Sequence, residues 1–226
     1  MSEGGTRLLG LFGGTFDPLH VAHMRLALEA REALGLSEVC FIPAGNPALR
    51  AAPTCPAADR LAMVERTVGG ISGFSVDAAE VLAARNPTPS YTVDTLERQR
   101  SLHGPRRPLV LLIGADAFAR FESWQRWREL FELAHIAVAT RPGHELSLGT
   151  GTSALDAELR ARQGSAADLA AAPAGRIVPF AITALEVSAT TIRHRLASGL
   201  DVRYLVPEAV LDYIDSHQLY RTPHGH

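Results

Sequence analysis

The chain has 226 residues, of which 46% are hydrophobic and 20% are charged, and its formal net charge is −2. This length suffices for one α/β domain with a substantial core, and the near-neutral charge argues against a general nucleic-acid binder, which is usually basic. The two cysteines suggest no disulfide framework or zinc site, and no apolar run is long enough to span a membrane, so we expect a cytoplasmic protein that binds neither nucleic acid nor membranes.

Strand-like apolar runs alternate with helical patterns along the chain, which is typical of parallel βαβ units. We expect strands at residues 8–12, 39–43, 74–77, 109–113, 135–139 and 177–182. Helices are expected at residues 21–34, 59–68, 90–102, 115–133, 190–197 and 207–217, with Ser90 as an N-cap and Pro207 as a first helical residue. The alternation predicts an α/β fold with a Rossmann-like, doubly wound parallel sheet.

We expect residues 1–226 to form a single domain. Between about 144 and 175 the composition shifts to Ala, Gly, Ser and Thr, which predicts a surface insertion with one short helix near 155–162. The last two expected helices form a small C-terminal helical portion at about 188–220.

The segment GGTFDPLHVAH (residues 13–23) joins the first expected strand to the first expected helix. Paired glycines after a strand let backbone N–H groups approach an anion, and a helix start adds donors and the positive end of its dipole. His20 and His23 are three residues apart and therefore lie on the same side of the helix. This ordered combination predicts a polyphosphate-binding site.

Each part of this segment also has a simpler structural interpretation. Paired glycines are often only a turn, and a His-x-x-His pair without a third ligand nearby is more often structural than metal-binding. We therefore predict no metal site made by the protein itself. The Walker A and GxGxxG phosphate loops are both absent from the segment.

Polar residues also follow the other expected strands, and ligands of doubly wound sheets bind at these carboxyl ends. They are Asn46, Arg50, Gly114, Asp116, Arg141, Ser188, Thr190, Thr191 and Arg193. Hydroxyls at a helix start followed by an arginine, as in residues 188–193, form a second candidate anion site. An ordinary N-cap with a solvated arginine explains the same residues, and the sequence leaves both interpretations open.

An aromatic and aliphatic stripe recurs at every third position of the expected helix at 115–133. It consists of Phe118, Phe121, Trp124, Trp127 and Leu130. Such a stripe is more often core than ligand platform, although a tryptophan at a helix junction can stack on a planar heterocycle. The stripe alone does not choose between Trp124 and Trp127.

The chain resembles the bacterial nicotinate-nucleotide adenylyltransferases, which belong to the nucleotidyltransferases with a His-x-Gly-His motif. The resemblance follows nearly the whole chain through GGTFDPLHVAH (13–23), SYTVDTL (90–96), IGADAFARFESW (113–124), RPG (141–143), VSATTIRHRL (187–196) and LVPEAVLDYI (205–214). The first motif is common to the superfamily. SYTVDTL and the GADAF block favour the nicotinate enzymes over the pantetheine-phosphate adenylyltransferases.

This resemblance implies Mg²⁺-dependent transfer of AMP from ATP to nicotinate mononucleotide, giving deamido-NAD and pyrophosphate in NAD biosynthesis. It implies catalytic roles for His20, His23 and Arg193, with His23 stabilising charge at the α-phosphorus. The implied ATP-binding residues are Gly13, Gly14, Thr15, Phe16, His20, His23, Gly114, Asp116, Arg141, Ser188, Thr190, Thr191 and Arg193. The implied mononucleotide-binding residues are Asn46, Arg50, Thr92, Trp124 and Gln125.

Within the implied acceptor site, Thr92 and the backbone after Trp124 recognise the nicotinate carboxylate, and the Trp124 ring stacks on the pyridine. Mg²⁺ bridges ATP phosphates mostly through water, which explains why no carboxylate cage is visible. A homo-oligomer is compatible with the sequence.

Two positions depart from the family pattern. Ala22 replaces the glycine before the second histidine, and Asn46-Pro47-Ala48-Leu49-Arg50 replaces Pro-Pro-His-Lys/Arg, so the histidine contact to the mononucleotide is missing. Two alternatives to the nicotinate reaction stay open. One is an adenylyltransferase for nicotinamide mononucleotide or phosphopantetheine, and the other is a non-catalytic nucleotide-binding protein, which only these departures support.

Overall fold

A computed structural model describes residues 7–48, 52–84, 89–141, 143, 146 and 153–221. Within these residues, one six-stranded sheet has the order β3-β2-β1-β4-β5-β6, and each neighbouring pair is parallel. The strands are β1 (Leu9–Gly14), β2 (Glu38–Pro43), β3 (Phe74–Val76), β4 (Leu109–Gly114), β5 (His135–Thr140) and β6 (Ile177–Ala181). The predicted Rossmann-like α/β fold is confirmed.

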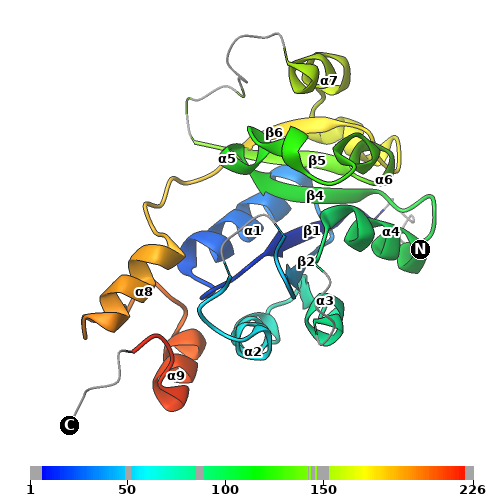
Figure 1. Ribbon diagram of the computed structural model, residues 1–226. Coiled ribbons are helices and arrows are strands. Elements are labelled where there is room, and N and C mark those ends of the chain that lie inside the picture. The colour runs from blue at the N-terminus through cyan, green and yellow to red at the C-terminus, as the bar shows by residue number, and fades with distance from the viewer. Residues whose placement is uncertain are drawn as a thin grey trace.

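Helices connect the strands and continue after the last one (Figure 1). The α-helices are α1 (Val21–Leu34), α2 (Ala57–Val68), α3 (Ala79–Ala83), α4 (Thr92–His103), α5 (Ala115–Phe118), α6 (Leu130–Leu133), α7 (Ala154–Arg162), α8 (Ala189–Ala197) and α9 (Glu208–His217). Three 3₁₀ segments are η1 (Phe121–Ser123), η2 (Trp127–Glu129) and η3 (Ala166–Ala170). No helix in the described part of the chain is both long and apolar enough to cross a membrane.

The sheet is buried on both faces because its strands place apolar side chains alternately on each side. In β2, Val39 and Phe41 belong to one core cluster, and Cys40 and Ile42 belong to the other. The first cluster contains buried residues of α1, α2, η3, α8 and α9. The second contains buried residues of α4, α5, α6 and α7, so the helices cover both faces.

The strand order reverses between β1 and β4, and these two strands separate toward their carboxyl ends. Their pairing ends at Leu11 and Leu111, whereas β1 stays paired with β2 as far as Gly14. In doubly wound sheets, ligands bind at this switch point. Gly13 and Gly14, the last two residues of β1, therefore lie at this switch point, beyond the last pair between β1 and β4.

The expected helix at 115–133 is wrong, since the segment breaks into α5, η1, η2 and α6. Trp124 is extended (ψ 144°) and Arg126 has a left-handed φ of 52°. The guanidinium of Arg126 pairs with Glu97 on α4 at 2.8 Å and with Glu129, which supports this local geometry. A repeat of three residues is the period of a 3₁₀-helix, so the aromatic stripe itself contained the signal.

Smaller expectations also needed correction at helix ends. Ser90 is not an N-cap, because α4 begins at Thr92 with Tyr91 in the capping position. Pro207 occupies the N-cap of α9 and is not its first helical residue. The five-residue α3 was not predicted, since it is too short to show a hydrophobic period.

The described part of segment 144–175 contains residues that belong to the two core clusters. Its α7 confirms the expected short helix near 155–162. Leu155 on α7 is 2% exposed in one core cluster, and Leu169 on η3 is fully buried in the other. The segment therefore adds apolar residues to both faces of the sheet.

Candidate active site

Gly13 and Gly14 were expected in a turn after the first strand, but they are the last two residues of β1 and stay paired with β2. The space beside these two glycines differs. A Cβ on Gly13 would meet nothing within 4 Å, whereas a Cβ on Gly14 would lie 2.7 Å from the Phe16 ring. The Phe16 ring is 2% exposed and packs edge-on against Phe12 and His23. The Phe16 ring therefore packs in the core beside Gly14. Because the ring is buried, only the Phe16 backbone is available to contact a nucleotide.

His20 and His23 lie together at the start of α1. Their rings stack with centroids 3.6 Å apart, and His23 Nδ1 accepts the backbone N–H of His20 at 3.2 Å. His20 is 6% exposed, and burial lowers its pKa to about 4, so the ring is neutral near pH 7. Its buried Nδ1 has no hydrogen-bond partner among the described residues. A buried polar atom without a partner is unusual and fits a site completed by a ligand or water.

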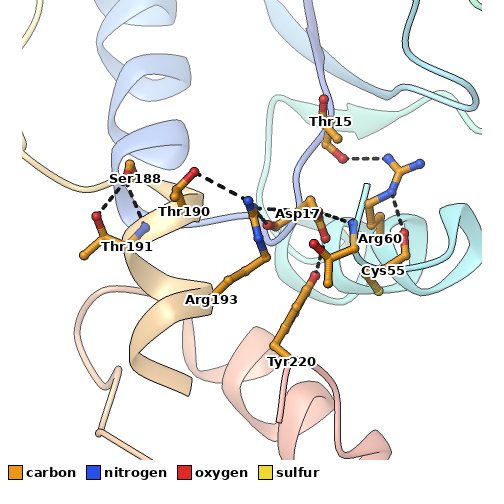
Figure 2. A network of polar contacts seen from close by, with 10 residues as sticks. Thr15, Asp17, Cys55, Arg60, Ser188, Thr190, Thr191, Arg193 and Tyr220 are labelled. Atoms are coloured by element: carbon orange, nitrogen blue, oxygen red, sulfur yellow. Dashed lines mark hydrogen bonds and ion pairs between the residues drawn. The ribbon is translucent and has the colours of Figure 1, made fainter. Parts of the chain in front are cut away.

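The N-terminus of α8, which contains the residues of the second predicted anion site, lies near the loop that joins β1 to α1 (Figure 2). Ser188 is the N-cap and accepts the Thr191 N–H at 3.1 Å, which confirms its capping role. Arg193 is not simply solvated, because it donates to the backbone carbonyl of Asp17 at 2.6 Å. Residues 13–23 and 188–193, far apart in sequence, thus meet at one place.

Buried Arg60 links the loops that follow β1 and β2 by hydrogen bonds, and it was not predicted from the sequence. Arg60 on α2 is 1% exposed and donates to the carbonyls of Thr15 at 2.6 Å, Gly45 at 3.1 Å and Cys55 at 3.2 Å. Burial lowers its pKa below the ordinary value for arginine. In a sequence, a charged residue within an amphipathic helix pattern is normally assigned to the solvent-exposed face. Only the fold shows that Arg60 connects the loops after β1 and β2.

The loop after β2 is held by α3 and by the residues before α4. The backbone of Asn46 accepts the Ser90 N–H at 2.8 Å, and its own N–H donates to Ser90 Oγ at 3.3 Å. Glu80 on α3 accepts the Gly45 N–H at 3.4 Å and the Thr95 hydroxyl at 2.5 Å, and burial raises its pKa. These contacts bring predicted residue Asn46 next to the start of α4, where Thr92 lies.

Predicted residues Thr92 and Trp124 both lie on the α4 side of the sheet. Thr92 is the first residue of α4 and is half-buried. The Trp124 ring is half-buried with its centroid 5.0 Å from that of Phe121, and Gln125 beside it is exposed. The ion pair between Arg126 and Glu97 ties this loop to α4. The arrangement leaves part of the Trp124 ring uncovered.

The remaining predicted residues lie at the ends of β4 and β5. A Cβ on Gly114 would meet nothing within 4 Å, which matches the open space above Gly13. Asp116 and Arg141 are both exposed at their strand ends. Arg50 lies outside the described residues. Within those residues, no group of three or more His, Cys, Asp or Glu side chains could hold a metal ion.

The hydrogen-bond donors at the N-termini of α1 and α8 suit an anion better than a cation. Two stacked imidazoles lie at the N-terminus of α1, and Arg193 of α8 contacts the Asp17 backbone in the loop that joins β1 to α1. Helix N-termini and arginine favour phosphate, and none of these groups is a strong general base. The site can therefore bind a polyphosphate and stabilise negative charge that builds on it.

Comparisons with known proteins agree with this assignment. A family model described as cytidylyltransferase-like matches residues 11–195. A relative from Dechloromonas aromatica (strain RCB), described as a probable nicotinate-nucleotide adenylyltransferase, is 50% identical over 214 residues, covering 94% of this chain and 97% of the relative. A relative of the same description from Pseudomonas syringae pv. tomato is 46% identical over 217 residues, covering 96% of this chain and 95% of the relative.

A solved structure shares the fold at much lower identity. The nicotinic acid mononucleotide adenylyltransferase of Plasmodium falciparum, complexed with NaAD, aligns with a TM-score of 0.67 and 16% identity over 95% of this chain and 97% of its own. The same enzyme complexed with APC gives a TM-score of 0.65. These structures support the six-stranded architecture.

Proposed function

The chain belongs to the nicotinate-nucleotide adenylyltransferases, and from this premise we propose how its own residues transfer AMP from ATP to nicotinate mononucleotide. The observation that carries the proposal is the contact between residues 13–23 and residues 188–193, made by Arg193 and Asp17 beyond the carboxyl end of β1. One phosphate chain can contact both segments there. Deamido-NAD and pyrophosphate are the products of this reaction, and the cytoplasm is its proposed location.

The nucleophile in the proposed reaction is an oxygen of the mononucleotide 5′-phosphate. It forms a bond to the α-phosphorus of ATP, the bond from that phosphorus to the bridging oxygen breaks, and pyrophosphate leaves with the electron pair. Because this phosphate is already anionic at neutral pH, no strong base is needed. The protein has to align the two nucleotides and stabilise charge on the α-phosphate and the leaving group.

In the proposed site, ATP is bound by the glycines at the end of β1, by His20 and His23, and by the N-terminus of α8. His23 stabilises charge at the α-phosphorus, and neutral His20 offers one further hydrogen bond. Arg193 and the hydroxyls of Ser188 and Thr190 hold the terminal phosphates. This division is the one that the family resemblance implies, and the contact of Arg193 with Asp17 beside α1 supports it.

We propose that Mg²⁺ enters with ATP and is held by the phosphate oxygens. The donor set around the turn is cationic or neutral, which fits the phosphates themselves and not a metal cage. Bound in this way, Mg²⁺ supplies positive charge to the phosphate chain. The chain's own residues then orient that complex.

We propose that nicotinate mononucleotide, the acceptor, binds near Asn46, Thr92 and Trp124. The half-exposed Trp124 ring is available to stack on the pyridine. Thr92 at the start of α4 offers a hydroxyl and a helix N-terminal N–H to the nicotinate carboxylate. A carboxylate therefore fits this place better than the neutral amide of nicotinamide mononucleotide.

Product analysis tests this proposal. The purified protein is incubated with ATP and Mg²⁺ and, in separate reactions, nicotinate mononucleotide or 4′-phosphopantetheine. Mass spectrometry should find deamido-NAD and one equivalent of pyrophosphate only in the first reaction. A dinucleotide-free mixture with bound but uncleaved ATP would instead identify a non-catalytic nucleotide-binding protein.

A further inference from the structure

Asp17 lies at the centre of the contacts between the β1–α1 turn and the C-terminal half of the chain (Figure 2). It is 5% exposed, and each carboxylate oxygen has a neutral donor. Oδ1 accepts the Tyr220 hydroxyl at 2.8 Å, and Oδ2 accepts the Thr54 N–H at 2.8 Å. The carboxylate orientation is therefore fixed from two sides.

Arg193 makes only a loose ion pair with this carboxylate. Its Nη1 is 3.7 Å from Asp17 Oδ2 and instead donates to the Asp17 backbone carbonyl at 2.6 Å. A carboxylate free to turn would form a closer, bidentate pair with a guanidinium. The neutral donors on Asp17 hold it out of that geometry, which leaves Arg193 N–H groups and charge for another anion.

Tyr220 reaches Asp17 from 203 positions along the chain. After α9 the backbone adopts left-handed φ values at Gln218 (53°) and Tyr220 (61°), which L residues rarely adopt. This reversal turns the Tyr220 side chain back toward the β1–α1 turn. Burial raises the Tyr220 pKa above its ordinary value, so the hydroxyl stays protonated and can donate.

We propose that Tyr220 is a positioning residue: its hydroxyl holds the Asp17 carboxylate away from Arg193 and so keeps the Arg193 guanidinium available to the terminal phosphates of ATP. The inference rests on the proposed function for the role of Arg193. It makes the end of the chain after α9 part of the phosphate site.

Tyr220→Phe removes only the hydroxyl and tests the proposal. The KM for ATP and the inhibition constant for pyrophosphate should each rise about tenfold, the scale of one hydrogen bond to a charged group. The KM for nicotinate mononucleotide should stay within about twofold, because the acceptor contacts are untouched. A variant whose ATP and pyrophosphate constants equal those of the wild type overturns the proposal.

Tyr213→Phe is a matched control on α9. The Tyr213 hydroxyl donates to Asp59 Oδ1 at 2.8 Å, which is also a tyrosine–aspartate hydrogen bond. Within the described residues, the hydrogen bonds and ion pair of Arg193 involve Asp17 and Thr190 and not Asp59. Thermal unfolding measures any loss of stability in both variants. If Tyr213→Phe raises the ATP constants as much as Tyr220→Phe does, the effect is general loosening and the proposal fails.

A double variant tests whether Tyr220 acts through Asp17. In an Asp17→Asn background, adding Tyr220→Phe should change the ATP constants by no more than about twofold, since coupled residues are not additive. A full tenfold effect in that background contradicts the proposal. Pyrophosphate affinity by calorimetry needs no turnover, so the inference is tested even if the adenylyl transfer itself is not found.

Discussion

The rings of His20 and His23 stack 3.6 Å apart with their planes at 25°, at the N-terminus of α1. Two imidazolium ions at this separation would repel each other, and burial keeps His20 neutral. The stack therefore combines a neutral, enclosed ring with a more accessible partner. This division is compatible with the charge-stabilising role that we propose for His23.

Replacing His23 by alanine should lower kcat by about two orders of magnitude, the scale for one donor to a transition state. Steady-state kinetics with ATP and nicotinate mononucleotide measure the loss. His194→Ala is the control, because this exposed histidine on α8 has no place in the proposed site. Near-normal turnover of the His23 variant would remove this residue from the mechanism.

The lowered pKa of His20 predicts a pH dependence of stability. In the unfolded chain the ring takes up a proton near pH 6.5, and in the folded protein only near pH 4. Its stabilising contribution is thus complete above about pH 6.5 and is lost as the pH falls toward 4, by up to about 1.4 kcal/mol per pH unit.

Urea unfolding of the wild type and of His20→Asn between pH 7.5 and 5 isolates this contribution from that of other histidines. The free energy of unfolding should fall less steeply in the variant. Parallel curves for the two proteins would show that His20 titrates normally in the folded state.

Alanine substitution at the two glycines that end β1 should have different effects: on stability at Gly14 and on ATP binding at Gly13. In Gly14→Ala, the new methyl meets the Phe16 ring, and the free energy of unfolding should fall by about 1–3 kcal/mol. In Gly13→Ala, the methyl enters open space, so stability should change by less than about 0.5 kcal/mol while the KM for ATP rises. An unchanged ATP constant for Gly13→Ala would place the phosphates elsewhere.

Arg60 should matter for both substrates because it joins the turns after β1 and β2. Arg60→Met leaves three buried carbonyls without donors and should cost about 3 kcal/mol or more of stability. Arg60→Lys can satisfy only part of the set and should raise the KM values for both ATP and the mononucleotide.

Arg66→Lys on the same helix is the control for Arg60, since Arg66 is exposed. Denaturant unfolding and initial-rate kinetics are measured on all three variants. A change in only one KM for Arg60→Lys would show that the two turns are held independently.

Hydrophobic periodicity was enough to predict the sheet, because its strands are buried on both faces and read as apolar runs. It also placed α1 at residues 21–34. Local patterns were not enough for the segment after β4, where contacts of Arg126 with Glu97 and Glu129 replace a continuous helix. Tertiary contacts decide such segments, and a single sequence does not show them.

In the candidate site too, local motifs predicted some residues, and others depend on tertiary contacts. Motifs placed His20, His23 and Arg193 near one another, and the fold brings their segments together. Asp17 and Arg60 were missed because their roles depend on partners distant in sequence. Buried polar groups that link loops have no local pattern, although Asp17 lies inside the motif that drew attention to the turn.

The proposed acceptor site is tested most directly by the ratio of kcat/KM for nicotinate mononucleotide to that for nicotinamide mononucleotide, measured by pyrophosphate release with ATP and Mg²⁺. The two acceptors differ only in a carboxylate against an amide. We expect at least about a tenfold preference for the acid, because we propose that Thr92 and the start of α4 bind its negative charge. Equal use of the two acceptors would contradict this proposal.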